Sequence, residues 1–279
     1  MERCRPPGDA PETLLAYRDR LLDDPAFQSD SAAREASLDG LRGLIRHLPV
    51  DADFGAALDG HIAARFGAGA RVRLRSSTNA EDLPEFSGAG LYDSYAADAT
   101  GADAASLEIR KTWASVWNWR AFEERAFWNI DQRAVRMGVA VHPNFPDEQC
   151  NGVLITRNLA DPTVAGFYVN VQAGELAVTN PQGGAIPEVF TIAEAPAGGM
   201  QVIRQRFSTL SPDAPLMTDA EVNALYAAAY EVQRHFAALC GRDPYDLAMD
   251  LEFKLHGPER RLIIKQARPY HDVSTGATR

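Results

Sequence analysis

Apolar residues recur at helical spacing over the first quarter of the chain and predict helices between residues 12 and 66. The pattern is carried by Leu14, Leu15, Tyr17, Leu21 and Leu22, and then by Leu38, Leu41, Leu44, Ile45 and Leu48. Pro49 is expected to end one helix, and Gly67 the last one before a strand that starts at Arg71. No motif in this region points to a particular fold, so we interpret it as a helical lead-in.

A longer helical pattern spans Ala104 to Ile130 and predicts one continuous helix. All four tryptophans of the chain fall inside it. They belong either to a helix packed firmly on a sheet or to an aromatic ligand box. The spacing of the apolar residues favours the packed helix.

Short β-like runs follow, separated by turn residues, at residues 134–141, 152–156, 166–172, 188–192 and 201–207. A second strong helix is predicted from Asp219 to Leu239. Thr218 and Glu221 form a capping-box signature at its start, and Gly241 follows its end. This order of helices and strands indicates an α+β fold.

The segment DLAMDLEFKL (residues 246–255) alternates apolar and polar positions, as a strand with one buried face does. The apolar face is made by Leu247, Met249, Leu251, Phe253 and Leu255, and the polar face by Asp246, Asp250, Glu252 and Lys254. Two carboxylates two positions apart on one strand face, such as Asp250 and Glu252, repel one another unless a cation lies beside them.

A turn (HGPERR) and a second strand (LIIKQAR) come next, which predicts a β-hairpin. If the hairpin is centred on its proline, Asp250 falls opposite Gln266. Glu252 then falls opposite Ile264, and Arg268 lies one step further along the same surface. Carboxylate and amide oxygens, completed by phosphate oxygens, are ligands that magnesium prefers. The alternative is a solvent-exposed face whose charges offset each other.

A second polar feature lies in residues 71–95, RVRLRSSTNAEDLPEFSGAGLYDSY, which begin as an alternating strand and end in a polar loop. Arg75 is expected at the junction, followed by Ser76 and Ser77. A guanidinium, two hydroxyls and the backbone of a glycine-containing loop are suited to binding a polyanion. The alternative is a strand followed by an ordinary surface loop.

The composition is ordinary for a globular protein of 279 residues, with 46% hydrophobic and 24% charged residues. A net charge of −10 argues against general binding to nucleic acid or to anionic membranes. No apolar run approaches the ~20 residues of a membrane helix, and the N-terminus has no apolar segment of the signal-peptide type. The odd number of widely spaced cysteines (Cys4, Cys150 and Cys240) fits a reducing, cytoplasmic location.

Lysine is scarce, because only Lys111, Lys254 and Lys265 among the 28 basic residues are lysines. Any lysine that touches a phosphate is therefore one of these three. The six histidines are scattered and form no metal motif, and no Ser/His/Asp triad can be deduced.

Several segments together resemble the nucleotide-binding domain of the family of pyruvate phosphate dikinase, phosphoenolpyruvate synthase and the glucan water dikinases, an ATP-grasp-type fold. RSSTNAEDLPEFSGAGLYDSY resembles its signature loop, and WASVWNWRAFEERAFW the helix after that loop. VAVHPNF, NGVLITRN, DLEFKL and IIKQARPY resemble later strands and the closing hairpin, in the family's order. The resemblance implies an ATP-grasp-like nucleotide-binding domain at residues 71–272, between a helical lead-in region at 1–70 and a tail at 273–279.

The resemblance also implies roles for individual residues. Arg75 and Arg268 would act as catalytic residues that contact ATP and offset charge on its phosphates. Asp250 and Glu252 would hold Mg²⁺. Glu252 and Gln266 would also lie at the nucleotide.

Other implied contacts lie in loops and at one strand end. Glu81 and Asp82 would help to position the signature loop. The strand ending at His142 occupies the place where ATP-grasp proteins bind adenine, so His142 is either a ring contact or a strand-end histidine. Gly174-Glu175 and Asn180-Pro181 resemble ligand-side loops, which makes Glu175 a candidate nucleotide contact.

One element of the family pattern is missing from the sequence. The family's nucleotide domain normally begins with Gly-Gly-Lys, but here no lysine precedes Lys111, and neither Gly183-Gly184 nor Gly198-Gly199 is followed by one. The chain is either the carboxyl-side portion of a longer protein or a shortened relative. It also lacks the family's phosphohistidine domain and pyruvate-binding barrel, so a complete dikinase cycle is not expected from this polypeptide alone.

The predicted function is that of an Mg-ATP-binding phosphotransferase domain, which passes a phosphoryl group from ATP to a histidine on another domain or chain. Its expected partners are ATP, Mg²⁺ and a phosphohistidine-type acceptor. Two alternatives stay open: a non-catalytic module that senses nucleotides, and a kinase of small molecules such as antibiotics.

Overall fold

The computed structural model describes residues 3–4, 12–83, 86–88, 90–176, 178, 184–195 and 199–270. The chain divides into two compact units, Met1–Asn144 and Phe145–Arg279. The predicted tail at 273–279, the Asn180-Pro181 loop, Gly183 and Gly198 lie outside the described residues. The boundaries that the sequence suggested after residues 70 and 272 remain predictions.

The first unit begins with a two-stranded pairing of β1 (Arg3–Cys4) and β2 (Glu12–Thr13), followed by helices. These are α1 (Leu14–Asp23), α2 (Pro25–Ser29), α3 (Ser31–His47) and α4 (Ala52–Phe66). The predicted helical region is confirmed, including its ends. The helix before Pro49 stops at His47, and α4 stops at Gly67, whose φ of 100° suits a residue without a side chain.

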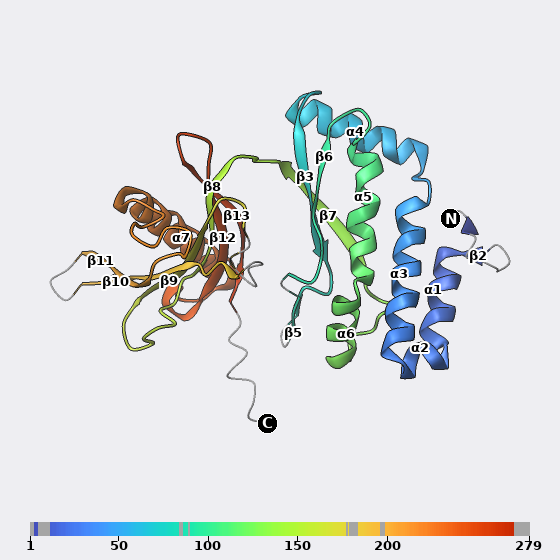
Figure 1. Ribbon diagram of the computed structural model, residues 1–279, viewed down its shortest axis with the longest axis horizontal. Helices are drawn as coiled ribbons and strands as arrows, with labels where there is room; N and C mark the ends of the chain where they lie inside the picture. The colour runs from blue at the N-terminus through green and yellow to red at the C-terminus, as the bar shows by residue number, and fades with distance from the viewer. Residues whose placement is uncertain are drawn as a thin grey trace. The chain divides into compact units, whose positions relative to one another are not determined.

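The sheet of the first unit has β3 (Arg71–Thr78) at its centre, paired antiparallel with β6 (Tyr95–Asp98) and β7 (Met137–Pro143). Helix α5 (Ala105–Ala114) covers one face, and α3 and α1 form successive layers outside it (Figure 1). Val72 and Leu74 of β3 are fully buried against Ile109 of α5. A helix packed on a sheet, as predicted, is therefore confirmed for this part of the tryptophan-rich segment.

The prediction of one continuous helix from 104 to 130 is wrong. The segment forms α5, a short 3₁₀ helix η1 (Ser115–Trp117) and α6 (Trp119–Phe127), separated by Asn118 in an extended conformation with ψ of 133°. The amide of Asn118 donates hydrogen bonds to Leu91 O at 3.1 Å and to the Asp93 carboxylate at 3.2 Å. Asparagine readily bonds to backbone in this way, and here it gains partners that a continuous helix would deny it.

The buried guanidinium of Arg125 stabilises this break. It is fully shielded from solvent and donates from Nη2 to Val116 O at 2.7 Å, from Nη1 to Tyr92 Oη at 3.1 Å and from Nε to Gln132 Oε1 at 2.9 Å. Tyr92 Oη in turn donates to Ala80 O at 2.9 Å. Arg125 therefore connects α6 to the loop that follows β3, which is the segment that resembles the family's signature loop.

The second unit contains one antiparallel sheet in the order β11-β10-β9-β8-β12-β13. Its strands are β8 (Glu148–Ile155), β9 (Gly166–Ala173), β10 (Glu188–Glu194), β11 (Met200–Arg206), β12 (Met249–His256) and β13 (Arg261–Pro269). All six strands of this sheet lie where the sequence predicts a β segment. The mixture of helices and sheets confirms the α+β prediction.

Helix α7 (Asp219–Cys240) packs on one face of this sheet (Figure 1). The predicted capping box of Thr218 and Glu221 is present, and Gly241 ends the helix in a left-handed conformation with φ of 62°. A 3₁₀ turn, η3 (Pro244–Asp246), leads into β12. None of the helices in the described ranges is long and apolar enough to cross a membrane.

The predicted apolar face of β12 faces α7. Met249, Leu251, Phe253 and Leu255 are fully buried in the core between the helix and the sheet. The Phe253 ring also explains Gly152 on β8, because a Cβ there would lie 2.4 Å from Phe253 Cζ. Since side chains alternate along a strand, Asp250 and Glu252 lie on the opposite face of the sheet.

Candidate functional site

The β12–β13 hairpin has a different register from the one predicted. Asp250 pairs with Arg268 and Glu252 with Gln266, whereas the prediction placed Asp250 opposite Gln266 and Glu252 opposite Ile264. The reason is a turn over residues 257–260 and a β-bulge between Glu252 and Phe253. The predicted grouping of Asp250, Glu252, Gln266 and Arg268 on one surface of the hairpin nevertheless holds, because both pairs lie side by side.

Asp250 and Arg268 form an ion pair on this surface. The Nε and Nη2 groups of Arg268 donate to Oδ2 of Asp250 at 2.9 Å and 2.7 Å. Only 14% of the arginine side chain and 16% of the aspartate side chain are exposed. Two neighbouring carboxylates need a cation beside them, and for Asp250 this cation is Arg268 on the adjacent strand.

Lys265 lies next to the second carboxylate. In a regular strand Lys265 and Gln266 would point to opposite faces, but the bulge makes Lys265 the extra residue on β13. As a result Lys265 Nζ lies 4.0 Å from Glu252 Oε2. The bulge thus brings a lysine to the surface that also carries Gln266, which the sequence pattern did not reveal.

Lys254 is a buried charge on the same strand, with 6% of its surface exposed. Its ammonium donates to Glu148 Oε1 at 2.6 Å and to Phe145 O at 2.8 Å, and it lies 5.5 Å from the centre of the Phe145 ring. A lysine held by an anion, a carbonyl and a ring together anchors the start of β8 to β12. Lys254 therefore has a set of structural partners at the start of β8.

Arg75 lies inside β3, not at the junction of strand and loop, because β3 continues to Thr78. It pairs with Ala140 of β7, and the backbone N–H of the next residue, Ser76, donates to Ser94 Oγ at 3.2 Å. Arg75 is half-buried. The strand gives its side chain a fixed origin, which an arginine in a mobile loop would not have.

His142 lies in β7 opposite Arg73, at the end of the strand predicted to face adenine. Its Nδ1 lies 2.8 Å from Pro143 O. The imidazole is therefore oriented by its own strand, and both interpretations of His142 stay predictions.

Glu175 is exposed in the turn after β9. This turn is held by Asn151, whose Nδ2 donates to Gly174 O at 2.7 Å and to Leu176 O at 2.9 Å. Asn151 is the first residue of the NGVLITRN segment, and its role in fixing the turn was not recognised from the sequence. A signal was present, because a polar residue at a buried strand position needs a hydrogen-bonding partner.

The loop after β3 forms a small hairpin of β4 (Asp82–Leu83) and β5 (Phe86–Ser87). Gly88 N donates to Glu81 O at 2.6 Å, and a Cβ on Gly88 would lie 3.0 Å from Glu81 Cα. Glycine is thus required for this approach of backbone to backbone, whereas the sequence suggested that the loop glycines serve the approach of a ligand. Glu81 lies in the described loop, whereas the side chain of Asp82 lies outside the described residues.

The candidate residues are divided between the two units. Arg75 and His142 belong to the first, and Glu175 with the hairpin residues belongs to the second. Convergence of the two sets on one ligand stays a prediction. Within the described ranges there is no group of three or more acidic, histidine or cysteine side chains placed to hold a metal ion by themselves.

Comparison with known proteins identifies the family. The sequence profile described as pyruvate phosphate dikinase, AMP/ATP-binding domain, matches residues 20–278. The chain belongs to this family. The resemblance inferred from the sequence is therefore confirmed, and the match includes most of the helical lead-in as well.

Several longer proteins are similar in sequence to this chain. A phosphoenolpyruvate synthase of Pseudomonas aeruginosa is 29% identical over 94% of this chain and 37% of its own length. That of Pyrococcus furiosus is 25% identical over 97% of this chain and 35% of its own length. A rifampicin phosphotransferase of Streptomyces sviceus is 31% identical over 69% of this chain and 23% of its own length. The chain spans about a third or less of these relatives.

Proposed function

We propose that this chain is an ATP-grasp-like domain that binds Mg-ATP and passes a phosphoryl group to a histidine on another domain or chain. The observation that carries the proposal is the polar face of the β12–β13 hairpin. It gathers two carboxylates, one amide and two cations opposite the face that packs on α7. Family membership supports binding of an adenine nucleotide.

The donor set on the hairpin fits a magnesium ion that is shared with a nucleotide. Asp250 and Glu252 offer carboxylate oxygens and Gln266 an amide oxygen, all from adjacent positions of paired strands. Three protein oxygens are too few to fill the shell of magnesium, which usually keeps water and phosphate oxygens as ligands. When bound, the ion would supply positive charge that offsets the negative charge of the phosphates.

The ion pairs of the hairpin suggest how its charges would be used. Arg268 lies beside Asp250 and Lys265 beside Glu252, so each carboxylate has a cation next to it. A divalent cation on the carboxylates would replace these two positive charges. The guanidinium and ammonium would then bind phosphate oxygens, so no charge would be left without a partner.

Arg75 is proposed to bind the phosphates from the first unit. Its guanidinium would act as an electrostatic stabiliser of the transferring group, because negative charge is spread over the phosphoryl oxygens during transfer. Its position inside β3 supports this role, since a side chain on a paired strand is oriented before the ligand arrives. His142 and Glu175 are proposed as additional nucleotide contacts.

The acceptor is proposed from the relatives. They are named phosphoenolpyruvate synthases and rifampicin phosphotransferases and are about three times longer than this chain or more. A phosphohistidine domain, on the same or on a separate polypeptide, would receive the phosphoryl group from ATP. The proposal includes magnesium as the metal, an ATP-grasp-like fold for the domain and a cytoplasmic location for the protein.

The decisive experiment is calorimetric titration of the chain with ATP, with and without Mg²⁺, using Asp250→Asn and Asp213→Asn. Asp213→Asn is the control: it also removes one negative charge, but Asp213 is exposed and lies outside the hairpin strands. We expect Asp250→Asn to weaken Mg-ATP binding at least tenfold and Asp213→Asn to leave it unchanged. Equal affinities of both variants would refute the metal assignment.

A non-catalytic nucleotide sensor is the second candidate, favoured by the direct pairing of Asp250 with Arg268. That pairing joins the proposed phosphate-binding arginine to the proposed metal ligand. A sensor would bind Mg-ATP but would not label a histidine when the chain is incubated with radiolabelled ATP and a phosphohistidine domain. A small-molecule kinase would instead label a low-molecular-weight acceptor.

A further inference from the structure

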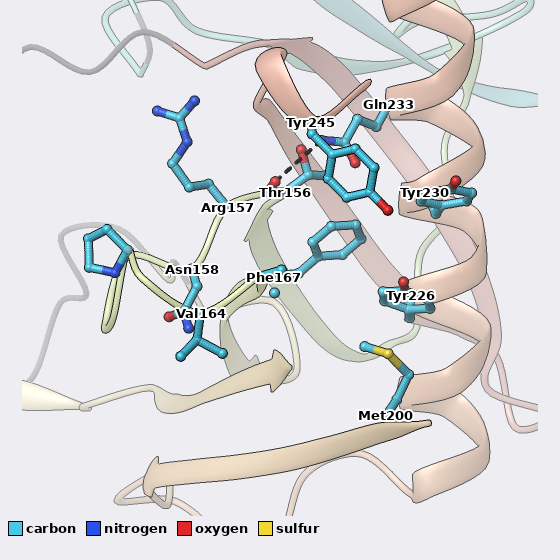
Figure 2. Close-up of a pocket in the computed structure, with 13 residues that line it drawn as sticks. Thr156, Arg157, Asn158, Val164, Phe167, Met200, Tyr226, Tyr230, Gln233 and Tyr245 are labelled. Atoms are coloured by element: carbon cyan, nitrogen blue, oxygen red, sulfur yellow. Dashed lines mark hydrogen bonds between the residues drawn. The ribbon is translucent and has the colours of Figure 1, made fainter. Parts of the chain in front are cut away.

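The second unit contains a cavity of about 450 Å³ that lies on the α7 side of the sheet. Its walls are the loop after β8, the start of β9, the start of β11, one face of α7 and the turn η3 (Figure 2). Asp250 and Glu252 lie on the opposite face of the same sheet. The cavity is therefore separate from the proposed nucleotide site.

Aromatic rings dominate one side of the cavity. Tyr226 and Tyr230 are one turn apart on α7, and their rings are nearly parallel, with centroids 6.3 Å apart and an angle of 15°. The Phe167 ring lies 4.9 Å from that of Tyr226 at 34°. Tyr245 of η3 adds a ring on the same side (Figure 2) and is 73% exposed. Aromatic rings gathered on one side of a cavity favour contact with a flat molecule, whereas a cage for a cation would surround it with rings.

The walls of the cavity are fixed by internal hydrogen bonds. Gln233 Nε2 donates to Pro244 O and Leu247 O, both at 2.9 Å, which attaches η3 and its Tyr245 to α7. Asn158 Oδ1 accepts from Ala160 N at 3.1 Å and Asp161 N at 3.0 Å, which fixes the loop after β8. A pocket that is already formed loses little entropy when a ligand binds.

The charge of the lining is positive. None of the described residues that line the cavity is acidic, although the whole chain carries a net charge of −10. Arg157 is the charged residue among those that line it, and it is exposed. It projects from the loop on the side away from α7, so rings and guanidinium lie at different sides of the cavity (Figure 2). Its guanidinium makes no hydrogen bond or ion pair with another described residue.

We propose that this cavity is a binding site for a planar aromatic anion, whose ring stacks on the tyrosines and whose carboxylate, sulfonate or phosphate group pairs with Arg157. The cavity volume lies within the range of small-molecule sites. Three phenol groups add hydrogen-bond donors that suit an anion or a neutral oxygen. The proposal is independent of nucleotide binding, because it uses the opposite face of the sheet.

The test compares three probes that share one ring system and differ in charge: 2-naphthoate, 2-naphthamide and 2-naphthylmethylammonium. Each is titrated into the whole chain by calorimetry or ligand-observed NMR. We expect naphthoate to bind about two- to fivefold more tightly than the amide, as an exposed ion pair allows, and the ammonium probe to bind most weakly. Absence of binding by all three, or strongest binding by the ammonium probe, would overturn the proposal.

Three exposed residues allow variants that leave the core intact. Arg157→Gln should make naphthoate and naphthamide bind equally, whereas Arg234→Gln, on an exposed part of α7 outside the cavity, should preserve the difference. Tyr245→Ala should weaken all three probes by about two- to tenfold. Saturating Mg-ATP should not displace naphthoate. Displacement, or an unchanged preference in Arg157→Gln, would show that the probes bind elsewhere.

Discussion

Arg268 and Asp250 lie directly opposite each other on adjacent strands, and two N–H groups of the guanidinium converge on one carboxylate oxygen at 2.7 Å and 2.9 Å. One strand thus supplies the proposed phosphate-binding group and the other the proposed metal ligand. Their mutual neutralisation allows both charges to be half-buried. In the proposed function, the guanidinium would turn to phosphate oxygens when Mg-ATP binds.

Binding of Mg-ATP should therefore change the environment of the Arg268 side chain. We expect the Arg268 Nε–H resonance, assigned with an Arg268→Lys variant, to shift on addition of Mg-ATP. ATP with a chelator should shift it less, because the carboxylate is then still available to the guanidinium. An Nε–H signal that is the same in all three states would contradict exchange of the ion pair.

Lys265 is expected to contribute to phosphate binding. Lys265→Gln should weaken Mg-ATP affinity about three- to tenfold and lower its dependence on salt, because one cation contact with the phosphates is lost. Lys265→Arg should retain most of the affinity. The matched control is Lys111→Gln, since Lys111 is bonded to Glu108 at 2.6 Å on α5. If both Gln variants behave alike, Lys265 has no specific role.

Arg125 should be essential for the stability of the first unit. Arg125→Met leaves Val116 O, Tyr92 Oη and Gln132 Oε1 without their donor, which should cost roughly 3 kcal/mol of unfolding free energy. Burial lowers the pKa of Arg125, yet an arginine stays protonated in proteins. Arg125→Lys should recover little, because an ammonium cannot reach three acceptors in the same fork.

Urea unfolding followed by tryptophan fluorescence measures this effect, since all four tryptophans lie in the first unit. The control is Arg120→Met, an exposed arginine on the same helix α6. A loss below about 1 kcal/mol for Arg125→Met would mean that the break at Asn118 does not depend on the guanidinium.

The Glu221–Arg260 pair should make stability depend on pH. Arg260 Nε donates to Glu221 Oε1 at 2.6 Å, which links the turn of the hairpin to the first turn of α7. Burial alone would raise the pKa of Glu221, but hydrogen bonds from Arg260 and Thr218 outweigh it and hold the pKa below its usual value of 4.5. The folded pKa is therefore lower than the unfolded one, so the stabilisation is full above about pH 4.5 and is lost as the pH falls through the folded pKa.

Glu221→Gln isolates this charge, because glutamine also serves at the third position of a capping box. At pH 7 the variant should be about 1 kcal/mol less stable than the parent, and the difference should vanish in acid. Unfolding followed by circular dichroism at several pH values measures it. Glu231→Gln, which removes an exposed pair with Arg234, should show a smaller difference at every pH; equal behaviour of the two variants would contradict the assignment.

Local patterns predicted most elements of this protein because their signals come from neighbours in the chain. The apolar periodicity of α3, the Thr218 and Glu221 capping box and the alternation in β12 each need only a few adjacent residues. For the same reason the sequence placed Asp250 and Glu252 on a polar face. It also carried the family resemblance, which the profile match confirms.

The remaining features depend on partners far apart in the sequence. The break at Asn118 requires Leu91 and Asp93, and the buried Arg125 requires Tyr92. Helical spacing continues across Asn118, so the pattern could not reveal the break. Likewise the cavity beside Tyr226 is formed by a loop, a helix and a turn that meet only in the folded chain.

By itself the sequence determined which residues form strands and helices, which face of β12 is polar, and which family the chain belongs to. Only the tertiary structure decided that Asp250 faces Arg268 and that Lys265 lies beside Glu252. The physical reason is the β-bulge between Glu252 and Phe253, because one extra residue in a strand shifts every pairing beyond it and re-aims a side chain. No periodic pattern in either strand encodes that shift.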